Sequence, residues 1–324
     1  MKKYFLFEQK FNVKTLAIQF FVFAFLFVSC DKVEAPYEEQ QNTSSANTNT
    51  NTNGGGGSGN NNNTNTCNDN FNAATATRKM VLFDFTGHKC GNCPEAHDAS
   101  TALHNQYGDK LIVLGVHVSG LAIPSPSTAT RFTYDFRCTT GNLFDQTYSF
   151  DAVGVPTAWI NYFDTTNLIT FSNTAWSTPV ANEINIAPDA YITLQNTFST
   201  STNILNTTVT SHYLNNLTAG KYNLCVYLLE DSISNWQKDY RLPSGQQDIA
   251  TYKHRHVLRA NLSDHYGDVV NPDGAMLKKD SCSTKSYSLD FTGKDWNPAH
   301  CSVVAFLYSK STKKVIQAEE KKIK

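Results

Sequence analysis

Two cysteines, Cys90 and Cys93, lie where a strand-like run gives way to a helical pattern, and this junction constrains the fold more than any other feature of the chain. Residues 79–85 (KMVLFDF) are a short apolar run of β-preferring residues, which predicts a strand. From residue 91 onward apolar residues recur at spacings of three and four, which predicts a helix, and residues 110–118 predict a second, buried strand. Strand, helix and strand in this order indicate a βαβ unit.

The start of a helix is a favourable place for reactive thiols. Unpaired backbone N–H groups and the helix dipole stabilise a thiolate there, so the thiol ionises more easily than an ordinary cysteine with a pKa of about 8.5. A separation of three residues also brings Cys90 and Cys93 within disulfide reach. We expect Cys90 to be exposed at the helix start and Cys93 to lie one turn further along.

The segment around the cysteines resembles the active site of the thioredoxin superfamily. Asp84 precedes Cys90 by six residues, as the strand acid of that superfamily does. The resemblance implies that Cys90 and Cys93 are the catalytic pair and that Asp84 moves the proton of Cys93. The alternative is an Asp84 that is partly exposed at the end of its strand.

A second segment, VGVPTAWI at residues 153–160, is similar to the cis-proline loop of the same superfamily. Its place downstream of the cysteine pair makes the resemblance more specific than a single X-Pro bond would be. If Val155–Pro156 is cis, the resemblance implies that Val155, Pro156 and Thr157 bind an extended substrate chain beside Cys90.

Four potential metal ligands lie close together in sequence: His88, Cys90, Cys93 and His97. Two thiolates and two imidazoles suit Zn²⁺ or Cu⁺. We favour solvated histidines over ligation, and we therefore expect no metal and no cofactor, with copper or zinc handling as an alternative.

Between the two thioredoxin-like segments, the chain is longer than a minimal fold of this type requires. Residues 121–130 are rich in Pro, Ser and Thr and predict a loop, whereas residues 131–150 predict a partly helical segment. Cys138 lies in this insert, and one interpretation pairs it with Cys67.

From residue 188 onward, strand-like segments separated by Asn, Gly, Ser and Asp clusters predict a β-sandwich. We expect Cys225 to be a buried free thiol, and Cys282 and Cys301 are candidates for a disulfide. In the run YKHRHVLR at residues 252–259, a strand would present His254 and His256 on one face. Two histidines can chelate a metal, but surface packing is the preferred interpretation.

The N-terminal residues predict export and lipidation. A lysine-rich start is followed by an apolar run that is too short for a membrane span and ends in Val28-Ser29-Cys30, which resembles a bacterial lipobox. We predict a signal peptide at residues 1–29, a lipidated Cys30, and a disordered tether through residue 66, which is rich in Asn, Thr and Gly.

Charge and length limit the remaining possibilities. Removal of residues 1–29 changes the formal net charge from −1 to −4. A mildly acidic protein lacks the excess of positive charge that nucleic-acid-binding proteins use, so the charge does not favour that function. The residues after the tether suit two domains, which we place at 67–187 (α/β, thioredoxin-like) and 188–324 (all-β, sandwich-like).

Taken together, the lipobox, the tether, the cysteine segment, the Val-Pro-Thr loop and the His-x-His-Val-Leu-Arg run resemble one family. It is the Bacteroidota outer-membrane lipoprotein family named for a twenty-eight-kilodalton member. The resemblance implies a lipid-anchored protein at the outer membrane, on its periplasmic or surface face.

Three functions fit the sequence. The first is a tethered thiol–disulfide oxidoreductase that acts on protein thiols and disulfides through Cys90 and Cys93. The second is a non-enzymatic surface module with a structural disulfide, whose β domain binds a protein or glycan. The third is the copper- or zinc-handling protein.

Overall fold

The structure is a computed structural model that describes residue 67 and residues 71–163, 167–172 and 175–324. The described residues belong to one compact unit. The predicted signal peptide, the lipidated Cys30 and the predicted tether through residue 66 lie outside the described residues. Among the residues that are described, no helix has both the length and the apolar character needed to cross a membrane.

The predicted strand–helix–strand unit is present at the start of the described chain. Strand β1 (Met80–Thr86) pairs in parallel with β2 (Leu111–His117), and helix α1 (Cys93–Tyr107) connects them. Both strands are buried along their whole length, as expected for parallel strands covered on two faces. The helix begins at Cys93 rather than at residue 91, so Cys90 lies in the turn that precedes it.

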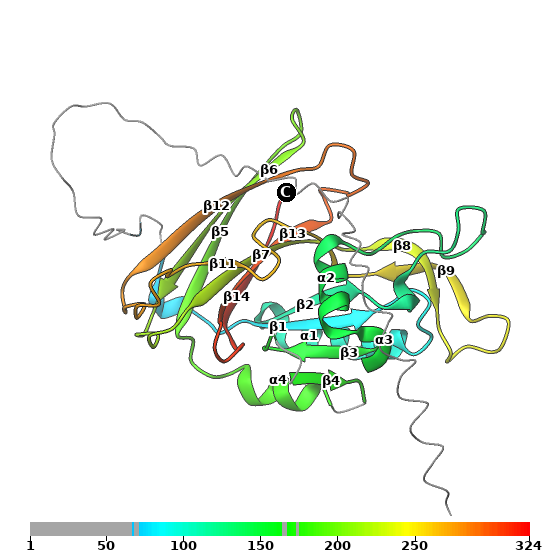
Figure 1. Ribbon diagram of the computed structural model, residues 1–324, viewed down its shortest axis with the longest axis horizontal. Helices are drawn as coiled ribbons and strands as arrows, with labels where there is room; N and C mark the ends of the chain where they lie inside the picture. The colour runs from blue at the N-terminus through cyan, green and yellow to red at the C-terminus, as the bar shows by residue number, and fades with distance from the viewer. Residues whose placement is uncertain (1–66, 68–70, 164–166, 173–174) are drawn as a thin grey trace, which may run out of the picture. The chain divides into compact units, whose positions relative to one another are not determined.

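Helices cover both faces of this part of the sheet (Figure 1). Because side chains alternate along a strand, β1 directs Met80 and Leu82 to one face and Phe83 and Phe85 to the other. On the first face these residues pack with α1 and α4 (Ser177–Glu183), and on the second with α2 (Thr139–Tyr148) and α3 (Phe150–Val153). Strand β3 (Thr157–Ile160) pairs antiparallel with β1, and β4 (Leu168–Thr170) pairs with β3.

The residues after 188 are mostly β-sheet, as the sequence predicted. A three-stranded sheet contains β5 (Ala190–Ser199), β6 (Ile204–Tyr213) and β12 (Cys282–Asp290). It packs face to face on β7 (Tyr222–Glu230), β13 (Cys301–Ser309) and β14 (Val315–Lys322), since apolar side chains from both layers share one buried cluster (Figure 1). This is the layered arrangement of a sandwich.

One nine-stranded sheet contains strands from both halves of the chain, and along its main path the order is β14-β13-β7-β10-β2-β1-β3-β4. Strand β10 (Val257–Asn261) joins the halves: it pairs antiparallel with β7 and, at Val257, in parallel with Gly115 of β2. The short β11 (Asp268–Val269) pairs with β7. Among the described strands, this sheet runs without interruption from strands that precede residue 188 to strands that follow it. The division into domains 67–187 and 188–324 stays a prediction.

The expected single strand at residues 252–259 was wrong. Strand β9 (Asp248–His254) ends and β10 begins at Val257, with the chain turning through Arg255 and His256, where the φ angle of His256 is +52°. The break allows β9 to form a two-stranded hairpin with β8 (Ile233–Lys238) while β10 enters the large sheet. His254 is buried and not on the surface.

The disulfides also differ from two of the expected pairings. Cys67 is bonded to Cys282, and Cys90 is bonded to Cys93. Cys138 instead caps α2, its sulfur accepting a hydrogen bond from the backbone N–H of Gly141 at 3.3 Å, and Cys301 is buried in β13. Cys282 lies on β12, an outer strand of the three-stranded sheet, where it pairs with β6 and bonds Cys67. The prediction of a buried free thiol at Cys225 is confirmed.

Candidate redox site

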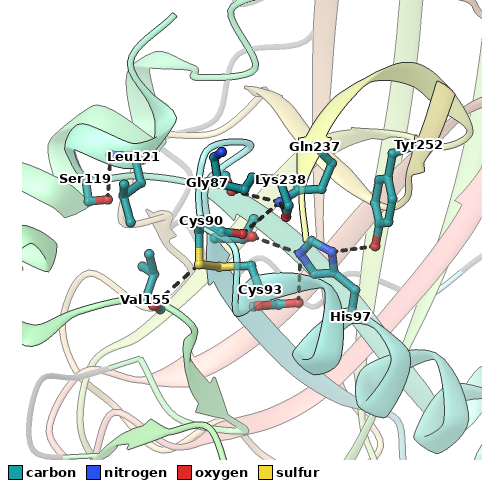
Figure 2. Close-up of a disulfide and its surroundings, with 12 residues drawn as sticks. Gly87, Cys90, Cys93, His97, Ser119, Leu121, Val155, Gln237, Lys238 and Tyr252 are labelled. Atoms are coloured by element: carbon teal, nitrogen blue, oxygen red, sulfur yellow. Dashed lines mark hydrogen bonds and ion pairs between the residues drawn. A yellow bond between two sulfur atoms is a disulfide. The ribbon is translucent and has the colours of Figure 1, made fainter. Parts of the chain in front are cut away.

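The Cys90–Cys93 disulfide closes the turn between β1 and α1 (Figure 2). The Cys90 N–H donates to the Gly87 carbonyl at 2.9 Å, so the turn begins directly after the strand. On one side the turn packs on Leu121, whose carbonyl accepts from the Lys89 N–H at 3.1 Å. Gly87 is required at this contact, because a Cβ there would lie 2.8 Å from the Leu121 carbonyl oxygen.

Cys90 is not exposed, contrary to the sequence expectation. It is 3% exposed, and Cys93 is fully buried. The turn lies between Leu121 on one side and residues of the β8–β9 hairpin on the other, as Figure 2 shows. The sequence pattern marked the start of the helix but could not show that a remote segment covers it.

The two predicted active-site segments meet in space. The Val155–Pro156 bond is cis, and the Val155 carbonyl oxygen lies 3.6 Å from the sulfur of Cys90. Thr157 follows as the first residue of β3 and is buried, and its hydroxyl has no hydrogen-bond partner among the described residues. A cavity of about 340 Å³ opens beside this loop and is lined by residues that include Asn92, Val155 and Pro156.

Asp84 lies on β1 and is 2% exposed, so the alternative of a partly exposed carboxyl was wrong. Its Oδ1 has no hydrogen-bond partner among the described residues, and its Oδ2 lies 3.9 Å from His97 Nε2. Burial away from water raises the pKa of Asp84 from 3.8 to about 8. At neutral pH this carboxyl is therefore mostly protonated and can exchange a proton.

His97 contacts the site rather than bulk solvent, so the expectation of a solvated imidazole was wrong. It lies one turn into α1, and 19% of its side chain is exposed. Its Nε2 is 2.8 Å from the hydroxyl of Thr86, and its Nδ1 is 2.8 Å from the hydroxyl of Tyr252 in β9. Burial lowers the pKa of His97 to about 4, so the imidazole is neutral at pH 7.

The β8–β9 hairpin supplies residues that the sequence did not identify. The side-chain amide of the fully buried Gln237 donates to the carbonyl of Cys90 at 2.9 Å and to that of Gly87 at 3.4 Å. The backbone N–H of Lys238 donates to His88, and that of Tyr240 donates to Gly91, so the hairpin edge pairs with the cysteine turn. These residues follow the cysteines by about 150 positions, and no local sequence pattern predicts that the hairpin contacts the cysteine turn.

A second cavity, of about 280 Å³, lies against Asp84 and His97. His117 of β2 and His254 of β9 also line it, and both are buried. His88 is buried too, instead of solvated, because it stacks on Phe132 with 5.6 Å between ring centroids. The nearby Phe136 packs on all three of these imidazoles.

The metal alternative has no ligand group at the cysteine turn. Within the described part of the chain, only Cys67, His212 and Cys282 place three donor atoms within 4.8 Å of one another, and those two cysteines form a disulfide. The four candidates named from the sequence do not form such a group.

The family model described as Outer membrane protein Omp28 matches residues 144–324, which is more than half of the chain. The chain belongs to the Omp28 family. The expected location is thereby confirmed: it is a lipid-anchored protein of the outer membrane. The Omp28 match includes the Val155–Pro156 loop and the β8–β9 hairpin, and it begins after the cysteine pair.

Solved structures give distant similarities to this Omp28 protein. HBP35 of Porphyromonas gingivalis is 19% identical with a TM-score of 0.49, and the alignment covers 76% of each chain. The protein AGR_C_4864 from Agrobacterium tumefaciens is 15% identical with a TM-score of 0.43, covering 78% of this chain and 97% of that one. A domain of the outer membrane lipoprotein Omp28 from P. gingivalis is 20% identical over 42% of this chain and 88% of that one, with a TM-score of 0.28. A search of curated proteins found no match.

Proposed function

We propose that this Omp28 protein is a thiol–disulfide oxidoreductase with a thioredoxin-like domain, anchored to the outer membrane through a lipid on Cys30. One observation carries the proposal. The Cys90–Cys93 disulfide lies at the start of α1 with the Val155 carbonyl 3.6 Å from Cys90 Sγ, and the strand before it holds the buried Asp84. The proposal takes Cys90 and Cys93 as the nucleophile pair, the Val155–Pro156 loop as the substrate loop and Asp84 as the proton carrier, and it is supported by the closeness of these three segments.

In the reduced form, the Cys90 thiolate attacks one sulfur of a substrate disulfide. The substrate S–S bond breaks, a Cys90–substrate disulfide forms, and the departing thiolate takes up a proton. Cys93 then gives its proton to Asp84 in the minority of molecules in which this carboxyl is ionised, and attacks the Cys90 sulfur. The Cys90–Cys93 disulfide closes and the second substrate thiolate leaves, so two electrons pass to the substrate. The oxidised form runs the same steps in reverse on a substrate dithiol.

Val155, Pro156 and Thr157 are the proposed substrate-binding residues. The Val155 carbonyl faces the attacking sulfur, and the neighbouring cavity of about 340 Å³ has room for a side chain next to the substrate cysteine. The expected partners are therefore proteins that carry a disulfide or a dithiol on an accessible segment of chain.

The test is a redox titration of the full-length protein in detergent. It is equilibrated across thiol/disulfide buffers, and alkylation of Cys90 and Cys93 is followed by mass spectrometry. We expect a reversible midpoint between about −270 and −120 mV, the range of exchanging dithiols. The Cys93→Ser variant should then trap mixed disulfides through Cys90. A pair that stays oxidised below about −300 mV is a structural bond and contradicts the proposal.

A specific observation favours one other function. Cys90 is only 3% exposed and is covered by the hairpin, as a structural disulfide would be. In that case the protein is a non-enzymatic surface module whose β region binds a protein or glycan. The same titration separates the two functions, because only an exchanging pair gives a midpoint within the stated range.

A further inference from the structure

The second disulfide, Cys67–Cys282, has a histidine beside it. The two sulfurs and a ring nitrogen of His212 all lie within 4.8 Å of one another. His212 is 4% exposed and Cys67 is half-buried, so the group is enclosed by protein but still reached by solvent. The Cys90–Cys93 pair has no such third donor among the described residues.

Strand pairing and a ring contact fix the side chains of this group. Cys282 of β12 and His212 of β6 are direct partners in the antiparallel register. Directly opposite residues project from the same face of a sheet, with Cβ atoms about 4.5–5.5 Å apart. The Phe71 ring stacks on His212 with 4.3 Å between centroids, and it also contacts Tyr191 of β5. The imidazole is therefore held between the sheet and the N-terminal segment that carries Cys67. In Figure 1 the blue start of the described chain lies beside this sheet.

Two thiolates and one imidazole are a known ligand set for zinc. Zn²⁺ binds thiolates at about 2.3 Å and imidazoles at about 2.0–2.1 Å, and three protein ligands leave a fourth tetrahedral position for water. With these bond lengths, tetrahedral ligand atoms lie about 3.5–3.8 Å apart. A disulfide holds its sulfurs about 2 Å apart, so after reduction they need to separate by less than about 2 Å. The group thus needs only side-chain movement to become a zinc site.

We propose that the Cys67–Cys282 pair, once reduced, binds Zn²⁺ together with His212, so that disulfide and zinc site are alternative states of one group. A dithiol supplies the electrons: the Cys67–Cys282 bond breaks, two thiols form, and the dithiol closes to a disulfide. Zn²⁺ then forms two Zn–S bonds and one Zn–N bond, and the two thiol protons pass to solvent. In reverse, a partner disulfide accepts two electrons and two protons, the Cys67–Cys282 bond forms again, and Zn²⁺ leaves.

The two states have one property in common. In each of them Cys67 is linked to Cys282, directly or through the metal, so the N-terminal segment stays attached to β12. Reduction therefore does not release the end of the chain that leads to the predicted lipid anchor. This inference goes beyond the proposed function and does not depend on it, because it makes no use of Cys90 or Cys93.

The test is a zinc titration of the full-length protein in detergent that carries Cys90→Ser and Cys93→Ser, so that this pair supplies no thiolates. The protein is reduced with a phosphine, which is then removed in the absence of oxygen. Competition with a chromogenic chelator gives the affinity for Zn²⁺, and native mass spectrometry gives the stoichiometry. We expect one Zn²⁺ per chain after reduction, and no binding of comparable affinity before it.

The decisive variant is His212→Phe, which keeps a ring to stack on Phe71 and removes the ligand nitrogen. Loss of a residue that only orients a zinc ligand costs about 10–100-fold in affinity, so loss of the ligand itself should cost at least about 100-fold. Cys67→Ser removes a thiolate and should weaken binding by at least as much. The matched control is His300→Phe, the same substitution at an exposed histidine outside the group, and it should leave the affinity unchanged.

An equal affinity in His212→Phe and its parent overturns the inference, and so does a reduced protein that binds no Zn²⁺. Far-UV circular dichroism follows the fold throughout. A reduced chain that unfolds and does not refold when Zn²⁺ is added also overturns the inference. None of these results bears on the redox titration, because the protein tested here lacks Cys90 and Cys93.

Discussion

At the scale of single residues, the protonation of Asp84 has a consequence for stability that is independent of catalysis. The folded protein holds the Asp84 proton up to a pKa of about 8, whereas the unfolded chain releases it near 3.8. Between these values the folded state binds more protons than the unfolded state. The free energy of unfolding contributed by this residue therefore falls as the pH rises through that window.

Asp84→Asn tests the predicted fall of the free energy of unfolding with rising pH, because it keeps the shape of the side chain without a titrating group. We expect the variant to gain stability over wild type, by more at pH 8 than at pH 5, because the cost of ionising a buried carboxyl is absent. Urea unfolding at the two pH values measures the difference. An equal gain at both pH values would contradict the assigned ionisation of Asp84.

Gln237 is the residue whose loss should most affect the cysteine turn. Its amide donates to the carbonyls of Cys90, Gly87 and Lys238, and Gln237→Leu removes these three hydrogen bonds, while Gly87 and Cys90 keep their backbone donors. One hydrogen bond contributes about 0.5–1.5 kcal/mol net, so we expect a loss of stability of about 1–3 kcal/mol. Gln247→Leu, on the same hairpin but with an exposed hydrogen bond, is the control and should change little.

At the scale of elements, the contact between the hairpin and the cysteine turn is tight at one point. The Tyr240 ring lies over Gly91, where a Cβ would come within 2.4 Å of the ring atoms. Tyr240 is 55% exposed, so the ring stays in place through this contact and the backbone hydrogen bond to Gly91 more than through burial.

Gly91→Ala should displace the Tyr240 ring and cost about 1–3 kcal/mol as an overpacking change. The double variant Gly91→Ala/Tyr240→Ala should be more stable than the sum of the two single effects predicts, since the clash is then absent. Urea unfolding of the four proteins gives the coupling energy. Strict additivity would mean that the ring and the turn do not pack together in solution.

At the scale of the whole molecule, several buried histidines lower the free energy of unfolding at acid pH. Burial lowers the pKa of His88 and His97 to about 4 and that of His254 to about 3, and it lowers that of His117 well below its ordinary value of 6.5. Between these values the unfolded chain binds more protons than the folded protein. The free energy of unfolding therefore falls as the pH drops from 6.5 toward 4.

We expect a stability maximum near neutral pH, because four histidines outweigh the opposite effect of Asp84 between about pH 4 and 6.5, whereas Asp84 alone of these groups acts from pH 6.5 to about 8. Urea midpoints measured from pH 4 to 8 give the profile. In His254→Phe the slope on the acid side should be shallower, because one fewer buried imidazole takes up a proton on unfolding. An unchanged slope would place His254 in contact with solvent.

The sequence alone determined the local chemistry. The strand before Cys90, the helix after Cys93 and the β-rich character of the residues from 190 onward follow from periodicity, because burial on one or two faces imposes a spacing on apolar residues. The break between β9 and β10 does not follow from it. The meeting of Cys90 with the Val155–Pro156 loop was foreseen through the thioredoxin resemblance, and the outer-membrane location through the family.

Only the tertiary structure decided what surrounds these groups. Segments far away in the sequence decide whether Cys90 is covered and whether His97 and His254 are solvated. They also decide which cysteine pairs with Cys67. Periodicity reports which residues are apolar, but not which distant segment desolvates a polar side chain. The β8–β9 hairpin pairs with the cysteine turn, and β10, which follows it, joins β2 at a single point; both pairings are properties of the folded chain.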